Sequence, residues 1–168
     1  NVFAARRGGL DDVAKLLDFG LVKTTTGSDS LHLTQEGTIT GSPLFMAPEQ
    51  ATGDGEPDAR ADIYALGCVA YFMLTGRPPF EGDKALKVLM AHANQPVTPP
   101  RELRPEIPID LEEVVLRCLA KRPDERYPTV TALAEALRLC ESWGRWTRAD
   151  AAAWWATSGR DVVEPAEA

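Results

Sequence analysis

The sequence lacks long apolar runs, clustered cysteines and paired histidines. None of its apolar stretches approaches the roughly 20 residues that a membrane-spanning helix requires, and its first residues do not have the pattern of a secretory signal peptide. The cysteines and histidines are widely spaced, without partners at the spacing of a metal site or a catalytic triad: Cys68, Cys118, Cys140, His32 and His92. We therefore expect buried, reduced thiols, incidental histidines and a cytoplasmic protein.

A basic run is also missing. Among the 168 residues, 25 Asp and Glu outnumber 18 Lys and Arg, which gives a net charge of −7. A negative surface without a basic cluster argues against nucleic acid or anionic membrane as a partner. The composition, 44% hydrophobic and 26% charged, is that of a globular protein, and the length suits one domain with a tail.

What the chain does contain is a stretch bounded by two short motifs. An Asp-Phe-Gly motif occupies residues 18–20 and an Ala-Pro-Glu motif occupies residues 47–49. Residues 23–38 between them are polar and rich in Ser and Thr, and residues 41–46 read Gly-Ser-Pro-Leu-Phe-Met. Each motif alone is common, but the pair in this order and at this spacing resembles the activation segment of protein kinases, closest to the bacterial serine/threonine kinases.

The resemblance implies a metal site made of Asn1 and Asp18. In the family, Mg²⁺ ions that bridge the ATP phosphates are held by the Asp of Asp-Phe-Gly and by an Asn that ends the catalytic loop. Carboxylate and amide oxygens are ligands that such hard cations prefer. Two short strands expected at 2–4 and 13–17, joined by a Gly-containing turn over 6–12, place Asn1 in the family's order. ATP and Mg²⁺ are therefore the expected cofactors.

The resemblance also assigns roles within the segment. Gly41, Ser42 and Pro43 correspond to the ledge that receives the substrate residue after the target hydroxyl, and their identities are typical of the serine/threonine class. Phosphate on a loop threonine would add charge that basic side chains can bind, and would thereby order the loop. The candidate phosphorylation sites are Thr38, Thr40 and Thr34. The expected partners are ATP, protein substrates and a second kinase molecule that phosphorylates this loop.

Three residues are assigned structural roles. Glu49 is expected to pair with Arg126, because the family joins these positions and a guanidinium binds a carboxylate bidentately. Residues 58–75 predict a central helix that is apolar on nearly every face, is therefore buried in a core, and ends before Gly76. Asp62 lies in its first turn. It either accepts bonds from the catalytic-loop backbone, as in the family, or stabilises the helix dipole.

The remaining chain predicts further helices. Asp83 is expected to cap a helix with apolar positions at Leu86, Leu89 and Met90, and Asp110 with Glu113 to form a capping box for another. The proline-rich residues 95–108 between them predict an extended surface connection. A last lobe helix follows near residues 130–139. In the tail, Thr147 and Asp150 could cap a short helix that ends in a Trp pair.

The resemblance implies a mainly α fold, α+β overall: the C-terminal lobe of the protein-kinase-like fold, with two short strands and then a helical lobe. It covers residues 1–139, and residues 140–168 form an extension with a Trp-containing helix and an acidic end. The family's Gly-rich loop, Lys-bearing strand and catalytic His-Arg-Asp are not among these residues, so this segment alone is expected to be inactive.

Two functions remain open at this point. The first is part of a serine/threonine protein kinase that transfers the γ-phosphate of ATP to protein substrates. The alternative is a pseudokinase or orphan lobe that acts as a protein-binding module. A membrane anchor elsewhere in the parent protein is compatible with either.

Overall fold

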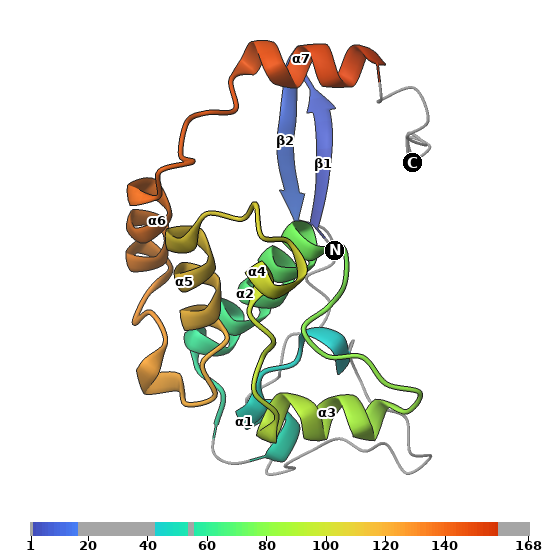
Figure 1. Cartoon of the computed structure of the whole chain (residues 1–168), viewed down its shortest axis with the longest axis vertical. Coiled ribbons are helices and arrows are strands. Elements are labelled where there is room, and N and C mark those ends of the chain that lie inside the picture. Colours follow the sequence, from blue (N-terminus) through green and yellow to red (C-terminus); the bar gives the residue numbers. More distant parts are fainter. Residues whose placement is uncertain (1, 17–42, 54–55, 158–168) are drawn as a thin grey trace. The chain divides into compact units, whose positions relative to one another are not determined.

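The computed structural model describes residues 2–16, 43–53 and 56–157 (Figure 1). In these ranges two strands precede a series of helices, which confirms the mainly α fold with a short strand pair. The chain divides into two compact units, one formed by Asn1–Thr25 with Trp143–Ala168 and the other by Thr26–Ser142. None of the helices in the described ranges combines the length and apolar character that a membrane crossing requires.

The first unit begins with an antiparallel hairpin. Strand β1 (Val2–Arg7) pairs with strand β2 (Leu10–Leu16), from Val2 opposite Leu16 to Arg7 opposite Leu10. Gly8 and Gly9 have φ values of 58° and 77°, which suits a two-residue turn in which both central residues need positive φ. The expected turn over 6–12 is therefore wrong: the Gly-Gly pair closes the hairpin tightly, so that the first strand continues to Arg7 and the second begins at Leu10.

The same unit contains helix α7 (Arg148–Thr157), which packs against β2. Figure 1 shows α7 crossing the turn end of the hairpin. The helix start is fixed reciprocally, since Asp150 Oδ2 accepts the Thr147 backbone N–H at 2.9 Å and Thr147 Oγ1 accepts the Asp150 backbone N–H at 3.2 Å. Trp155 is buried on the inner side of α7 and Trp154 is exposed.

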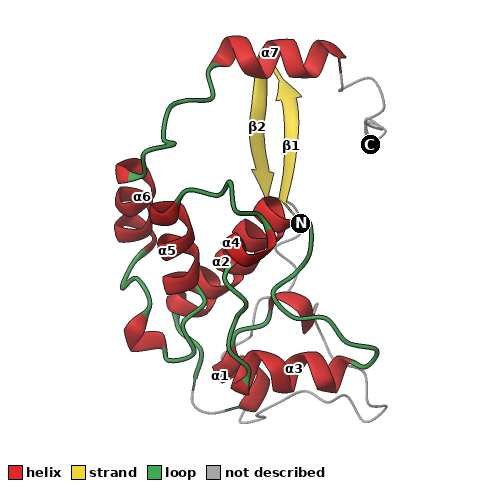
Figure 2. Cartoon of the chain, viewed as in Figure 1, coloured by secondary structure: helices red, strands yellow, loops and turns green. Residues whose placement is uncertain are grey.

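The second unit is helical (Figure 2). It consists, in chain order, of η1 (Pro43–Phe45), α1 (Pro48–Thr52), α2 (Ala59–Thr75), α3 (Ala85–Asn94), α4 (Pro100–Leu103), α5 (Ile109–Cys118), η2 (Pro123–Glu125) and α6 (Val130–Leu139). The long helix α2 contacts η1, α4 and α5. Asp58 caps its N-terminus by accepting the Arg60 backbone N–H, and Gly76 ends it with φ 80°. Its bounds agree with the prediction.

Two buried clusters make up the core of this unit, and α2 contributes to both. Tyr64, Cys68 and Tyr71 belong to one cluster and Ile63 to the other. The helices α2 and α5 approach so closely at Gly67 that an added Cβ would lie 2.7 Å from the Cβ of Cys118. Gly67 is therefore required by the packing of the two helices.

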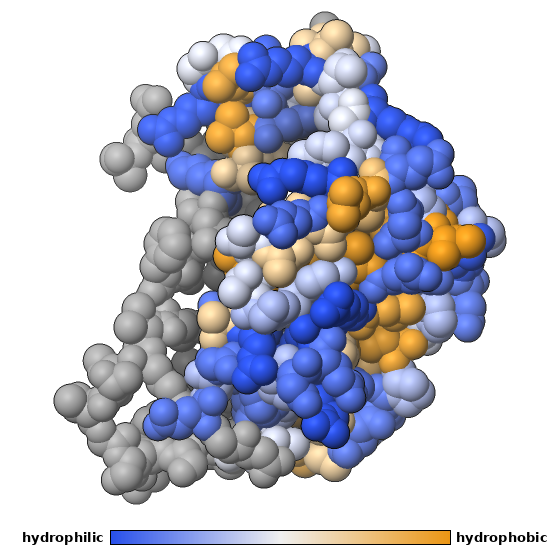
Figure 3. Space-filling view, turned by 90° about the vertical axis from the view of Figure 1, so that its left-hand side faces the viewer, coloured by the Kyte–Doolittle hydropathy of each residue, from blue (hydrophilic) through white to orange (hydrophobic). Residues whose placement is uncertain are grey.

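The expectation that α2 is buried on nearly every face is wrong. Leu66, Phe72 and Met73 are 42%, 47% and 76% exposed, so an apolar stripe of this helix faces outward. Exposed apolar residues also occur elsewhere, and Figure 3 shows separate orange apolar patches among blue hydrophilic side chains on one face of the molecule.

Several local expectations are also corrected. Helix α5 is capped by Pro108, and Asp110 lies inside its first turn, where its carboxylate accepts the backbone N–H groups of Leu111 and Glu141 at 2.8 and 2.6 Å. Lys84, not Asp83, is the N-cap of α3. The proline-rich stretch is not wholly extended, because Pro100 begins the short helix α4 at a position where its missing N–H has no cost.

All three cysteines are buried and free. Burial raises the pKa of Cys68 and of Cys118 to about 12. The expectation of buried reduced thiols is confirmed, and these groups remain protonated at neutral pH.

Candidate functional site

The residues predicted for the site fall partly inside the described ranges. Outside them lie the predicted metal ligands, most of the ledge and the candidate phosphorylation sites: Asn1, Asp18, Gly41, Ser42, Thr34, Thr38 and Thr40. Inside them lie Pro43, Glu49, Asp62 and Arg126. The described part of the site thus comprises the end of the predicted activation segment and the residues that hold this end in place.

The structure brings Glu49 and Arg126 together. Arg126 Nη1 donates to Glu49 Oε1 at 2.8 Å and Arg126 Nη2 donates to Glu49 Oε2 at 2.7 Å. The Arg126 side chain is fully buried, and that of Glu49 is 11% exposed. Glu49 is held in the first turn of α1 by Pro48, whose fixed φ suits a helix start. The two parallel bonds form the bidentate geometry in which a guanidinium and a carboxylate interact most strongly.

Arg126 also binds three backbone carbonyls. Its Nε donates to the carbonyl oxygen of Ala120 at 2.9 Å, Nη1 to that of Arg60 at 3.0 Å and Nη2 to that of Lys121 at 3.0 Å. With the two bonds to Glu49, all five guanidinium N–H groups have acceptors. The side chain therefore ties α1 and the start of α2 to the chain segment between α5 and η2.

A second buried layer lies next to this ion pair. The Arg126 guanidinium carbon is 4.9 Å from the centre of the Tyr64 ring, and the Tyr64 hydroxyl is 2.8 Å from His92 Nδ1. The His92 ring meets the Phe80 ring edge to face at 4.9 Å. Lys121 Nζ donates to the His92 carbonyl oxygen at 2.7 Å, and it lies 4.4 Å from the centre of the Phe80 ring. Helix α3 is thereby fixed to the centre of the unit.

The interpretation of His92 as incidental is wrong, because the side chain is completely buried. Its partner Tyr64 is 28 residues away in the sequence, so spacing alone does not connect them. A helical signal was present, however: Val88, Ala91 and His92 fall on the buried face of α3. A histidine in phase with apolar positions indicates a buried imidazole.

Burial, together with the smaller effect of the nearby Lys121 ammonium, lowers the pKa of His92 to about 4. The Leu44 backbone acts in the opposite direction, although the buried Nε2 atom makes no hydrogen bond of ordinary geometry with any described residue. Burial likewise lowers the pKa of Lys121 to about 8. His92 is therefore neutral at physiological pH, and its buried position suits support of the fold rather than proton transfer.

Asp62 lies in the first turn of α2 and is exposed. Within the described ranges no hydrogen bond to its carboxylate is present. The position suits stabilisation of the helix dipole. Bonds from a catalytic-loop backbone remain a prediction, because that loop is not part of this sequence.

Pro43, the last residue of the predicted ledge, is the first residue of the short helix η1. This helix contacts both α2 and α3, and the backbone N–H of Met46 donates to the Pro43 carbonyl oxygen at 3.4 Å. Phe45 packs against the first core cluster, and Ala47 is completely buried within it. The chain directly after the ledge is therefore fixed to the core.

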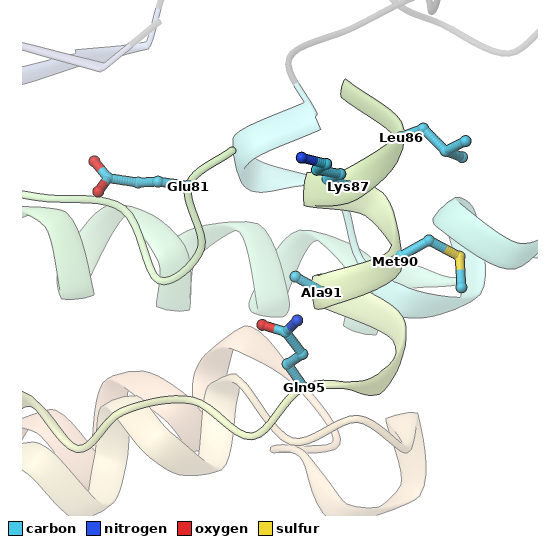
Figure 4. A pocket seen from close by; sticks show the side chains of 6 residues that line it. All are labelled: Glu81, Leu86, Lys87, Met90, Ala91 and Gln95. Atoms are coloured by element: carbon cyan, nitrogen blue, oxygen red, sulfur yellow. The ribbon is translucent and has the colours of Figure 1, made fainter. Parts of the chain in front are cut away.

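A shallow hollow of about 390 Å³ lies along α3 (Figure 4). In the figure, Leu86 and Met90 extend to the same side of the helix, and they are 67% and 55% exposed. The charged groups of its lining are Glu81 and Lys87, and Lys87 pairs with Asp83 at 2.8 Å. The lining has no net positive charge for a polyphosphate, so this hollow does not suit a nucleotide.

Comparisons with known proteins indicate the family of the chain. The family model of the protein kinase domain matches residues 1–137. The serine/threonine-protein kinase Pkn1 of Myxococcus xanthus is 43% identical over 139 residues, which are 83% of this chain and 20% of that protein. The serine/threonine-protein kinase PknB of Mycobacterium leprae is 40% identical over 129 residues, 76% of this chain and 20% of that protein.

The tyrosine-protein kinase MasK of Myxococcus xanthus is 46% identical over 123 residues, 73% of this chain and 18% of that protein. The chain thus spans about a fifth of the length of these relatives. With its buried Glu–Arg pair and helical lobe, the chain belongs to the protein kinase family. Most of these relatives are named serine/threonine-protein kinases, and all of them are bacterial.

Proposed function

We propose that this chain supplies the C-terminal-lobe half of the active site of a serine/threonine protein kinase, which transfers the γ-phosphate of ATP to Ser or Thr of protein substrates. The observation that carries the proposal is the anchoring of Glu49 by Arg126, in the helix that follows η1 and the predicted ledge. A segment that binds substrate needs a fixed end, and a pair with every donor satisfied provides one.

The metal-binding role of Asn1 and Asp18 belongs to this proposal. In the hairpin, Val2 pairs with Leu16, so the chain enters and leaves the strand pair at the same end. Asn1 directly precedes Val2, and Asp18 follows Leu16 by two residues. An amide and a carboxylate are donors that fit Mg²⁺. When bound, the ion would neutralise charge on the ATP phosphates.

The remaining roles concern the segment itself. Gly41, Ser42 and Pro43 would receive the substrate residue beside the target hydroxyl, and the support is the fixed position of Pro43 in η1. Phosphorylation of Thr38, Thr40 or Thr34 by a second kinase molecule would order the segment. These assignments place the proposed regulation and substrate binding between the metal ligand Asp18 and the anchor Glu49.

The exposed apolar residues of α2 support the proposal that the lobe contains further chain. Leu66, Phe72 and Met73 form an apolar face on the central helix, and the exposed carboxylate of Asp62 lies one turn before Leu66. A central helix with such a face is expected to be covered by further chain. That chain would carry the catalytic Asp and the ATP-binding Lys, and we expect these 168 residues alone to be inactive.

The test is phosphoamino-acid analysis of a protein substrate after incubation with the full-length gene product and γ-labelled ATP. We expect label on serine or threonine. Label on tyrosine would overturn the serine/threonine assignment, a pertinent outcome since one relative is named a tyrosine-protein kinase. Absence of transfer by a folded full-length protein would favour the alternative, a pseudokinase that acts by binding proteins.

A further inference from the structure

The β1–β2 hairpin contains an irregularity at Asp12. Ala5 pairs with Val13 and Arg7 pairs with Leu10, so two residues of β2 lie opposite the single residue Arg6 of β1. Asp12 has φ 55°, and it is the one residue other than glycine with positive φ among the described ranges. This conformation is uncommon for a residue with a side chain, and a bulge redirects the side chain that it carries. Aspartate is among the residues that adopt this conformation most readily, and contacts of its carboxylate stabilise it further.

Two tryptophans of the C-terminal segment hold it. Trp146 Nε1 donates to Asp12 Oδ2 at 2.6 Å, and Trp155 Nε1 donates to Asp12 Oδ1 at 2.6 Å. Each oxygen of one carboxylate thus accepts one indole N–H. Such bonds to an ionised acceptor are stronger than neutral ones. The bulge orients Asp12 so that its carboxylate accepts both indole N–H groups.

The contact is selective among neighbouring groups. The chain has four tryptophans, and neither Trp143 nor Trp154 donates to Asp12. Of the two donors, Trp155 is 7% exposed and Trp146 is 58% exposed. The adjacent carboxylate, Asp11, pairs instead with Arg6 Nε at 2.7 Å. The arrangement therefore joins particular indoles to a particular carboxylate.

The helix that carries Trp155 is short. Helix α7 has ten residues, and an isolated helix of that length is marginal in water. Ala151, on its inner side, is 4% exposed. Trp146 lies just before the N-cap residue Thr147, and Trp155 lies near the other end of the helix, so the two bonds hold α7 at both ends. Docking on the hairpin is what stabilises α7.

We infer that the bulge at Asp12 is a binding site for residues 146–157 of this chain, which include α7 and present two indole N–H groups, and that Asp12 is a positioning residue for strand β2. The strand runs from the bulge to Leu16, two residues before Asp18. The second part of the inference rests on the proposed function, because it assigns Asp18 to the metal. Docking of α7 then supports the strand that precedes the proposed metal ligand in the sequence.

The docking is tested on this chain with Asp12→Gly and Asp12→Asn. Glycine suits the positive φ and removes both acceptors, and asparagine tolerates the same φ but keeps one acceptor oxygen. We expect amide hydrogen exchange in residues 13–16 and 148–157 to become faster by at least about tenfold in Asp12→Gly, the factor that corresponds to about 1.4 kcal/mol. A smaller increase is expected in Asp12→Asn.

The matched controls are neighbouring residues of the same kinds. Trp146→Phe and Trp155→Phe should reproduce the faster exchange, while Trp143→Phe and Asp11→Asn should leave exchange in α7 unchanged. Amides of α2 report whether the helical unit stays folded. Unchanged exchange of residues 148–157 in Asp12→Gly would overturn the inference, and so would an equal effect of Trp143→Phe.

The positioning role is tested in the full-length protein. Asp12→Asn should raise the KM for Mg²⁺-ATP several-fold, and it should weaken Mn²⁺ binding measured without nucleotide by a similar factor. Asp11→Asn should change neither. If the wild-type protein transfers phosphate and Asp12→Asn matches it in both readouts, the positioning role is wrong. If the wild-type protein neither binds Mn²⁺ nor transfers phosphate, the proposed function fails and the positioning role fails with it, while the docking is judged by hydrogen exchange alone.

Discussion

Arg126 holds Glu49 through two parallel hydrogen bonds, 2.7 and 2.8 Å long, between residues that are 77 positions apart in the sequence. The guanidinium has no further donor to offer, because three backbone carbonyls accept its other N–H groups. The pair connects the end of the predicted activation segment to Arg126 at the end of η2, and Arg126 in turn binds carbonyl groups that precede η2. Because the pair is buried, removal of either side chain leaves the charge of the other without a partner.

Removal of Arg126 should therefore destabilise the chain strongly. Arg126→Ala leaves the Glu49 carboxylate and three carbonyl groups without their donor, and breaking a buried ion pair in this way costs about 3–5 kcal/mol. Arg126→Lys should recover only part of this, because an ammonium cannot reproduce the planar fork. Urea unfolding monitored by circular dichroism measures the free energy of unfolding.

The matched control for this prediction is Arg122→Ala. Arg122 pairs with Asp124 at 2.7 Å, but both side chains are largely exposed. Exposed pairs contribute little to stability, so the unfolding midpoint should stay close to that of the wild type. Equal effects of the Arg122 and Arg126 variants would contradict the central role of the buried pair.

Gly67→Ala distinguishes helix propensity from packing. Alanine is the better helix former by about 1 kcal/mol, so propensity alone predicts a more stable protein. The added methyl group would instead meet the Cβ of Cys118 at 2.7 Å. We expect a loss of roughly 1–3 kcal/mol, the usual cost of overpacking a core. A gain in thermal unfolding temperature would show that α2 and α5 can separate without cost.

Stability should fall in mildly acidic solution because of His92. Its pKa is about 4 in the folded chain and near 6.5 when exposed, so the unfolded state binds the proton first as the pH decreases. The contribution is complete above about pH 6.5. It is lost between about pH 6.5 and 4, with a slope of at most about 1.4 kcal/mol per pH unit. Urea unfolding at several pH values measures this slope.

The test of that assignment is a double replacement, His92→Phe with Tyr64→Phe, which removes the imidazole and its hydrogen-bond partner together. The variant should have a flatter profile between pH 6.5 and 4. His32→Gln removes the chain's other histidine and should leave the profile unchanged. A double variant with the wild-type slope would assign the pH dependence to other groups.

The sequence predicted those parts of the molecule for which the signal is local or borne by a motif. Helix α2 begins after Asp58 and ends before Gly76, as the capping residues indicate. The partner of Glu49 was predicted as well, although it lies far away, because both residues belong to motifs of one family. The protein kinase family was likewise identified from motif order, and its domain model matches residues 1–137.

The features that were missed depend on contacts between distant residues. The role of His92 depends on Tyr64 and Phe80, which reach it only when α2 and α3 pack together. The Asp12 carboxylate accepts the two indole N–H groups because of the bulge, and the residue types of β2 did not predict a bulge. The exposed side of α2 was missed because the apolar character of a residue does not show whether another helix packs against it.

The most direct test of the account is γ-phosphate transfer by the full-length gene product in its wild-type and Asp18→Asn forms, with thermal unfolding of both. We expect the wild type to phosphorylate a generic protein substrate, and the variant to lose at least about a thousandfold in rate, because electrostatic stabilisation by the bound metal supplies much of the catalysis. The unfolding temperature should be the same for both. An Asp18→Asn protein that phosphorylates the substrate at the wild-type rate would contradict the assignment of the metal site.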